Sequence, residues 1–325
     1  MPITLADAQN LSQNKLTKDV IDEFRKSPLL DMLPFDNTVK PQGGKSLAYA
    51  FNRITTQPTA GTRAINGEYV AQETKTTPQV SYLKIMGGAY EIDRVIAEDE
   101  TQVVNHIAFQ SNQKAKATVA EFNDLFINGN SSDNATEFDG IEKAVSGTTT
   151  EIDAGGLDMT TADNIKANAY KFLFLLRQLK KNMDGEPTHY LMNADMYAVF
   201  QTVADYVPNV RYTKDEMGND VLKYGAGVIV EMGDKPGTSN PIIATTAPSS
   251  TAFGTSDIYA VRIGLDGVHG VSPEGSSLVK TYLPDLKAPG AVKKGEVEMV
   301  AAIAVKATRA VGKIKGIAVL PKTKA

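Results

Sequence analysis

The sequence predicts an α+β fold with more than one domain. Its 325 residues are about twice the length of an ordinary single domain. Residues 98 to 128 carry apolar side chains at the spacing of a helix, whereas residues 41 to 97 and 296 to 320 alternate as strands do. Both kinds of element recur in the middle of the chain. We therefore expect helices and sheets together in roughly two domains.

Composition narrows the class of protein. Hydrophobic residues make up 42% and charged residues 22%, which is typical of a globular protein, and no apolar run approaches the roughly 18 residues of a membrane span. The absence of Cys excludes disulfides, thiol catalysis and Cys-ligated metals. The first 15 residues lack the pattern of a secretory signal, so we expect synthesis in the cytosol and no membrane partner.

Charge is distributed unevenly within a net charge of −4. Residues 286 to 325 hold nine Lys or Arg and two acids, Glu296 and Glu298. Such a basic end could bind nucleic acid, but it has no Phe, Tyr or Trp on which bases could stack. We interpret it as a charged strand face or a contact with an acidic neighbour.

The N-terminal 97 residues predict an arm and a long hairpin. Residues 4 to 26 have helical periodicity, and the Ser27-Pro28 pair ends that helix before the apolar stretch "SPLLDMLPF". Two strands follow, "KSLAYAFNRI" and "PQVSYLKIMGGAYEID", with a bulge or kink expected at Gly87-Gly88. About 25 polar residues separate these strands. A hairpin of that length rarely stands alone in water, so it must lie on its own domain or on another chain.

A long helix over residues 98 to 128 is the clearest element. Its predicted apolar stripe consists of Val104, Ile107, Ala108, Ala115, Val119, Phe122 and Leu125 or Phe126. Gly129 is expected to end it, and the Asn and Asp residues that follow tolerate left-handed backbone geometry. "FDGI" closes this polar loop at residues 138 to 141.

The remaining chain mixes helices and strands. Residues 161 to 183 predict an amphipathic helix capped by Thr161, "THYLMN" a buried strand, and Ala194 to Tyr206 a second helix. "GVIVEM", "PIIATT" and "DIYAVRIG" read as strands, and residues 296 to 320 alternate over a long distance.

No pattern of reactive residues indicates an enzyme. His106, His189 and His269 are each isolated from an acidic partner at ligand spacing, and "GAGVIV" lacks the third Gly of a dinucleotide-binding loop. Asp133, Glu137 and Asp139 miss the spacing of a calcium loop, so we expect them to form turns. We predict no catalytic residue, no metal or cofactor site and no cofactor.

The order of elements resembles the major capsid protein of tailed bacteriophages, which has the Hong Kong 97-type fold. The segments that carry the resemblance are "VIDEFRKSPLLDMLPF", "YEIDRVIAEDETQVVNHIAFQSNQKAKATVAEFNDLFINGN", "FDGI" and "HYLMNADMYAVFQTV". Each is weak as a motif, but their order spans nearly the whole chain.

This resemblance implies a division of the chain. The implied parts are an N-terminal arm (1–40), an extended loop (41–97), a peripheral domain with the spine helix (98–135), an axial domain (136–279) and return strands of the peripheral domain (280–325). Residues 129 to 137 would be the crossing between the two domains. The extended loop would lie over a neighbouring copy.

The resemblance also implies function and partners. It predicts a protein of the virion, made in the host bacterial cytoplasm, whose hexamers and pentamers form an icosahedral shell around DNA, with a scaffold, a portal and a cementing protein as further partners. Two alternatives stay open. One is another virion subunit, such as a tail-tube or adhesive β-rich protein, and the other is an enzyme built from scattered Asp, Glu and Lys.

Some members of that family join a Lys of the extended loop covalently to an Asn near the last strands of a neighbour. Candidate amines here are Lys45, Lys75 and Lys84, but the last Asn of the chain is Asn240 and only Asp285 precedes the final strands closely. An ionised carboxylate is a poor acyl acceptor. We therefore predict a shell without covalent links between its subunits.

Overall fold

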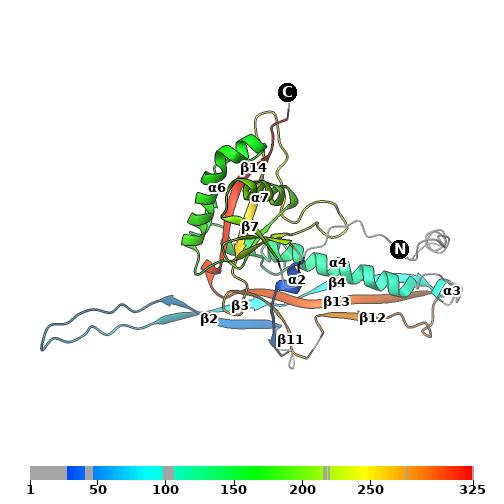
Figure 1. Cartoon of the computed structure of the whole chain (residues 1–325). Coiled ribbons are helices and arrows are strands. Elements are labelled where there is room, and N and C mark those ends of the chain that lie inside the picture. Colours follow the sequence, from blue (N-terminus) through cyan, green and yellow to red (C-terminus); the bar gives the residue numbers. More distant parts are fainter. Residues whose placement is uncertain are drawn as a thin grey trace.

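The computed structural model describes residues 28–40, 47–97, 106–214, 218, 220–275 and 277–323, and every structural statement below concerns these residues. The helix expected over residues 4 to 26, Lys45 and the first part of the long helix lie outside them. Figure 1 shows an elongated lower body, an upper lobe that stands on it, and a hairpin that projects far beyond both. No helix within the described residues is long and apolar enough to cross a membrane.

A five-stranded sheet forms the floor of the lower body. Its longest strand, β13 (Val292–Val305), pairs along one edge with β4 (Lys84–Asp93). Along its other edge β13 pairs first with β12 (Val279–Tyr282) and then with β11 (Val268–Pro273), and β1 (Phe35–Val39) extends the sheet beyond β11. All but the β1–β11 pair are antiparallel.

The long helix α4 (His106–Asn128) lies across β4 and β13 (Figure 1). Its C-terminal half buries the predicted residues Phe122, Leu125 and Phe126. The N-terminal half differs from the prediction, because Ser111 and Thr118 are buried there while Ala108 is exposed. Thr118 tolerates burial because its hydroxyl donates to the Lys114 carbonyl at 2.9 Å. The short helices of this body are α2 (Leu29–Met32) and α3 (Arg94–Ala97).

The upper lobe contains a seven-stranded sheet in the order β5-β14-β10-β6-β9-β8-β7. Its strands are β5 (Glu151–Asp153), β6 (His189–Met192), β7 (Val210–Lys214), β8 (Asp220–Tyr224), β9 (Gly227–Glu231), β10 (Gly254–Val261) and β14 (Val311–Leu320). The helices α6 (Ala162–Asn182) and α7 (Ala194–Tyr206) pack together over this sheet. Both helices were predicted, and the Thr161 hydroxyl accepts from the Asn164 amide as expected of an N-cap.

Two apolar cores meet at the seven-stranded sheet. One joins α6 and α7 to the sheet through residues such as Phe172, Leu176 and Phe200. The other continues from the opposite side of the lobe into the lower body, since Leu191, Val261 and Val311 belong to the same cluster as Phe122 and Phe126. The short helix α5 (Ile141–Val145) lies between α4 and β14 and contributes Ile141 and Val145 to this second core.

The hairpin differs from the prediction in how its second strand is used. The predicted strand over residues 78 to 93 is two strands, because β3 (Lys75–Tyr82) pairs with β2 (Ala48–Thr56) while β4 pairs with β13. The expected bulge is absent, since Gly87 and Gly88 keep the regular register of the β4–β13 pair. Gly87 is required for a different reason: a Cβ there would lie 2.1 Å from the Val297 carbonyl oxygen.

Two further strand predictions need correction. The last strands do not return together, because β13 belongs to the five-stranded sheet whereas β14 belongs to the seven-stranded one, and the 3-10 turn Thr308–Ala310 joins them. The strand β11 of the lower sheet also begins before residue 280. "PIIATT" forms no strand, although Ile242 and Ile243 are buried as a strand would bury them.

Candidate assembly surfaces

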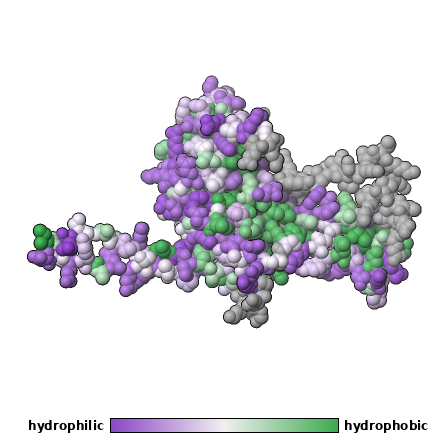
Figure 2. All heavy atoms as spheres, turned by 60° about the horizontal axis from the view of Figure 1, so that its bottom comes forward, coloured by the Kyte–Doolittle hydropathy of each residue, from purple (hydrophilic) through white to green (hydrophobic). Residues whose placement is uncertain are grey.

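The distal hairpin exposes apolar side chains that its own chain does not cover. Residues 57 to 74 connect β2 to β3, and within the hairpin the exposed large apolar residues are Ile54, Ile65, Tyr69, Val70, Val80 and Tyr82. Ile65 is 93% and Val70 85% exposed. Figure 2 shows a hydrophobic group at the far tip of an otherwise mostly hydrophilic hairpin. Apolar residues placed so far from the core are typical of a contact with another molecule.

The base of the hairpin is fastened firmly to the lower body. The Arg53 guanidinium on β2 donates to the Val305 carbonyl at 2.7 Å and to the Lys306 carbonyl at 3.0 Å. The Tyr49 hydroxyl donates to the Asp36 carboxylate at 2.9 Å, and the Tyr49 ring meets the buried His269 ring edge-on. Burial lowers the pKa of His269, so the neutral imidazole is favoured in this apolar contact. The hairpin therefore projects from a rigid base.

The segment from Gly129 to Gly140 is a closed loop that leads from α4 into α5. The Gly140 amide donates to the Gly129 carbonyl at 2.8 Å, so the two ends of the loop touch. A Cβ on Gly129 would lie 2.3 Å from the Phe138 oxygen, and one on Gly140 would lie 2.7 Å from two α4 carbonyls. Phe138 is buried against the Phe122 ring with centroids 5.7 Å apart. Both glycines thus serve close packing. No residue of the loop adopts the left-handed geometry that its Gly, Asn and Asp residues would tolerate.

The acidic residues of this loop form turns, as predicted. Asp139 accepts from the Ser131 amide at 2.8 Å and pairs with Lys143 at 2.7 Å. Burial raises the pKa of the Asp139 carboxyl, but these hydrogen bonds outweigh it and hold the pKa below its usual value. Glu137 accepts from the Asn130 amide at 3.2 Å. Each carboxylate therefore stabilises the loop itself.

A buried ionic cluster fixes α5 to the seven-stranded sheet. The Lys313 ammonium on β14 lies 2.8 Å from a Glu142 oxygen of α5 and 3.0 Å from an Asp257 oxygen of β10. The Tyr259 hydroxyl donates to Glu142 at 2.6 Å. Burial lowers the pKa of Lys313, but the hydrogen bonds to both carboxylates more than offset this and raise it. The charged cluster thus ties the end of the crossing loop to the upper lobe.

Part of the basic end of the chain is paired with acids or buried within the fold. Lys294 pairs with Glu296 at 2.6 Å and Lys315 with Glu151 at 3.0 Å, while Lys293 and Lys313 are buried. The Arg309 guanidinium donates to the Asn182 carbonyl at 2.6 Å. Within the described part of residues 286 to 323, these cations do not form one continuous free basic face.

The candidate crosslinking groups that the structure describes are Lys75, Lys84 and Asp285. Lys75 is exposed in β3, whereas the Lys84 ammonium donates to the Ala135 carbonyl at 2.5 Å. Asp285 accepts from the Lys287 amide at 2.9 Å in an exposed turn. The three histidines lie on separate elements, and the described residues contain no group of His, Asp and Glu that could hold a metal ion.

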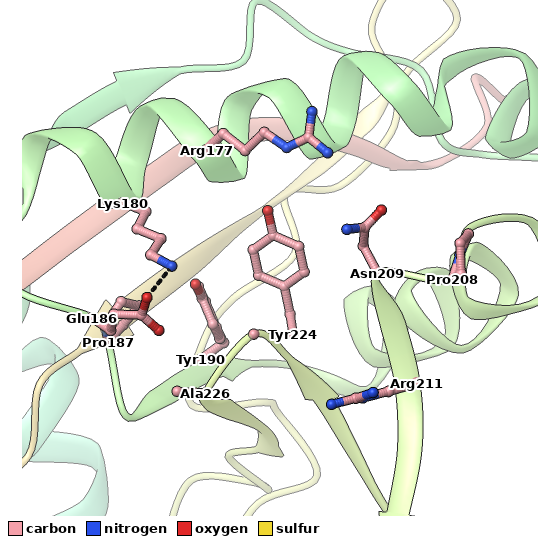
Figure 3. A pocket seen from close by; sticks show the side chains of 11 residues that line it. Arg177, Lys180, Glu186, Pro187, Tyr190, Pro208, Asn209, Arg211, Tyr224 and Ala226 are labelled. Atoms are coloured by element: carbon pink, nitrogen blue, oxygen red, sulfur yellow. Dashed lines mark hydrogen bonds and ion pairs between the residues drawn. The ribbon is translucent and has the colours of Figure 1, made fainter.

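An open pocket of about 390 Å³ lies in the upper lobe (Figure 3). Arg177 and Lys180 of α6 lie on one side of it, and Tyr190 and Tyr224 point toward them from the other. Lys180 pairs with Glu186, which leaves the lining with a surplus of positive charge from Arg177 and Arg211. Burial raises the pKa of Tyr190. The lining contains no Ser, Thr, Cys, His or Asp.

No protein-family model matches the chain, and no curated protein sequence matches it. Its structure, however, is similar to solved shell proteins over nearly its whole length. An encapsulin complex from Synechococcus elongatus matches with a TM-score of 0.65 and 13% identity over 100% of this chain and 99% of that one. The capsid of a native GTA particle matches with a TM-score of 0.60 and 12% identity over 97% and 100% of the two chains.

A third match is to the major capsid and decoration proteins of phage G, with a TM-score of 0.54 and 8% identity over 98% of this chain and 100% of that one. These identities are low, so the similarity concerns the fold. The lower body with its long helix, the upper lobe and the projecting hairpin are all included in these alignments, because each match covers both chains almost completely. The chain has the Hong Kong 97-type fold that phage capsid proteins and encapsulins share.

Proposed function

We propose that this chain is a major capsid protein that assembles into the icosahedral head shell enclosing phage DNA. The observation that carries the proposal is the distal hairpin, whose apolar side chains are covered by no other part of the chain that the structure describes. The full-length similarity to capsid shells supports it. Since the hairpin base is fixed by Arg53 and Tyr49, the hairpin is ready to bind a neighbouring copy at little entropic cost.

In this proposal the lower body is the peripheral domain and the upper lobe the axial domain near the capsomer centre. The main partner is the chain itself in hexamers and pentamers, and a scaffold, a portal and a cementing protein complete the head. The phage G structure supports the last of these, because it contains decoration proteins beside the capsid proteins. The protein is not an enzyme, it needs no cofactor, and it resides in the virion after synthesis in the host cytoplasm. Contacts with packaged DNA are non-specific.

The hairpin provides the test. Replacing residues 57 to 74 by Asn-Gly shortens the hairpin to its paired strands and leaves β4 in place, because Thr56 and Lys75 already face each other. Electron microscopy of the purified protein should show closed shells for the wild type and only subunits or capsomers for the shortened chain. The matched control changes two polar hairpin residues, Gln57→Ser and Thr62→Ser, and should form shells. Normal shells from the shortened chain would refute the role of the hairpin.

A second candidate function follows from the encapsulin match, which covers both chains almost completely. A shell of the same fold would then enclose protein cargo. The contents of shells purified from the native source distinguish the two candidates. Nuclease-protected DNA supports the phage head, whereas a co-purified protein without DNA supports the compartment.

A further inference from the structure

The outer face of α6 combines exposed aromatic residues with positive charge. Tyr170 is 73% and Phe174 59% exposed, and they are neighbours one turn apart on the helix. With Ala154, Leu157 and Leu175 they line an apolar depression of about 420 Å³. Figure 1 shows α6 at the outer edge of the upper lobe, on the side toward which the hairpin projects. Two large aromatic residues side by side on a helix surface are a typical centre for a protein contact.

The charge of this face is unbalanced within the chain. The helix carries five basic residues and one acid: Lys166, Lys171, Arg177, Lys180, Lys181 and Asp163. Lys180 pairs with Glu186 and Lys166 lies over the Tyr206 ring. Lys171, Arg177 and Lys181 are exposed and have no ion pair among the described residues. The face therefore suits a partner that is acidic as well as apolar.

The neighbouring helix α7 has the opposite character. It holds two acids, Asp195 and Asp205, and no basic residue. Asp195, Gln201 and Asp205 are exposed, and the 41% exposed Tyr206 ends the helix beside them. Since α6 and α7 lie next to each other over one sheet, the lobe presents a basic aromatic helix and an acidic helix side by side.

This pair of surfaces fits a second copy of the chain. A ring of identical subunits needs two different, complementary patches on each subunit, because the contact is head to tail. We propose that the outer face of α6 docks on the exposed face of α7 of the adjacent copy in the capsomer, with Tyr170 and Phe174 at its centre. The inference rests on the proposed shell function and identifies the contact between neighbouring upper lobes. Nucleic acid is the other partner that a basic face with exposed aromatic residues can bind. The experiments below distinguish the two partners.

The aromatic part is tested with the pair Tyr170→Ser and Phe174→Ser, against Leu265→Ser as the control. Leu265 is 55% exposed in the turn between β10 and β11 and belongs to neither helix. Sedimentation and native mass spectrometry measure the concentration at which capsomers form. We expect the α6 pair to raise it about 30-fold, as loss of a contact centre does, and the control to leave it unchanged. Capsomers of the α6 pair that form like the wild type would overturn the proposal.

The charge part is tested by a swap. Lys171→Glu with Arg177→Glu reverses α6, and Gln201→Lys with Asp205→Lys reverses α7. All four positions are exposed, so thermal unfolding should stay near that of the wild type. For each single-face variant, the concentration at which capsomers form should rise at least tenfold. For the chain with both faces reversed, this concentration should return most of the way to the wild-type value. Absence of rescue would overturn the contact.

The remaining outcomes separate the alternatives. A reversed α6 that forms normal capsomers but retains less DNA in filter binding assigns the face to nucleic acid and overturns the proposal. Wild-type protein that forms no capsomers would refute the shell function together with this contact. If the wild type forms capsomers and the α6 variants form them equally well, the contact is refuted and the shell function is not.

Discussion

Replacing Lys313 by Met should destabilise the upper lobe strongly, because it leaves two carboxylates without their shared cation. The side chain of Lys313 is 7% exposed, and its ammonium lies within 3.0 Å of both Glu142 and Asp257. Removing one partner of a buried ion pair costs about 3–5 kcal/mol. The two carboxylates here keep 37% and 29% exposure, so water screens part of the repulsion and we expect a cost of about 2–3 kcal/mol.

The matched control lies two residues along the same strand. Lys315 pairs with Glu151 at 3.0 Å but is 44% exposed, so Lys315→Met should cost much less than Lys313→Met. A triple variant, Lys313→Met with Glu142→Gln and Asp257→Asn, has a neutral cluster and should recover at least half of the loss, since no unpaired charge remains. The Tyr259 hydroxyl can still donate to the new amide oxygen.

Urea unfolding of dispersed subunits, followed by circular dichroism because the chain has no Trp, measures these differences. With a slope of about 3 kcal/mol per molar urea, the Lys313 variant should lower the midpoint by about 1 M and the control by a third of that or less. If Lys313→Met costs no more than Lys315→Met, the cluster does not stabilise the fold. If the triple variant is no more stable than the single one, the cost comes from lost packing and not from unpaired charge.

Other predictions follow from the same structure. Gly140→Ala should cost about 3 kcal/mol or more, because its Cβ would lie 2.7 Å from two carbonyl oxygens, and a wild-type melting temperature would contradict this. Arg53→Lys should speed amide hydrogen exchange at the hairpin base but not in α6, since one ammonium cannot replace both guanidinium bonds. The lowered pKa of Asp139 means that its contribution is full above the unfolded value of about 3.9 and is lost as the pH falls further, so Asp139→Asn should weaken the pH dependence of stability only in acid. Mature particles boiled in detergent should give one band near 34.9 kDa, and a ladder of larger species would reveal a covalent link that we do not expect.

Local signals in the sequence predicted the helices well. Thr161 and the periodicity after it located α6, and Gly129 located the end of α4. These predictions succeed because capping and helical burial depend on residues close together in the chain. The N-terminal half of α4 was predicted less well, since Ser111 and Thr118 are buried where apolar residues were expected.

The sequence did not predict which strands pair with one another. Alternation predicted that residues 78–93 and 296–320 are extended, but it does not say that β3 and β4 pair with different strands or that β14 leaves the sheet of β13. The β4–β13 pair, for example, joins residues about 200 positions apart in the chain. Nor did any motif identify Lys313 as a buried cation.

The candidate surfaces lack motifs for a similar reason. A docking face is defined by what remains uncovered after folding, and Tyr170 and Phe174 look in the sequence like two more apolar residues of an amphipathic helix. The hairpin was easier to anticipate, because about 25 polar residues with almost no apolar periodicity separate two strand patterns.

The continuity of β3 and β4 has a mechanical consequence. The chain passes from the hairpin into the lower sheet with only Leu83 between the two strands, and β4 is then held by ten register pairs with β13. Hydrogen bonds of an antiparallel pair run perpendicular to the strands. A force along the hairpin axis passes straight into β4 and loads all of these bonds together in shear. A force across the sheet would instead break them one after another. Tension between neighbouring copies would then be borne by the longest strand pair in the molecule, directly beneath α4.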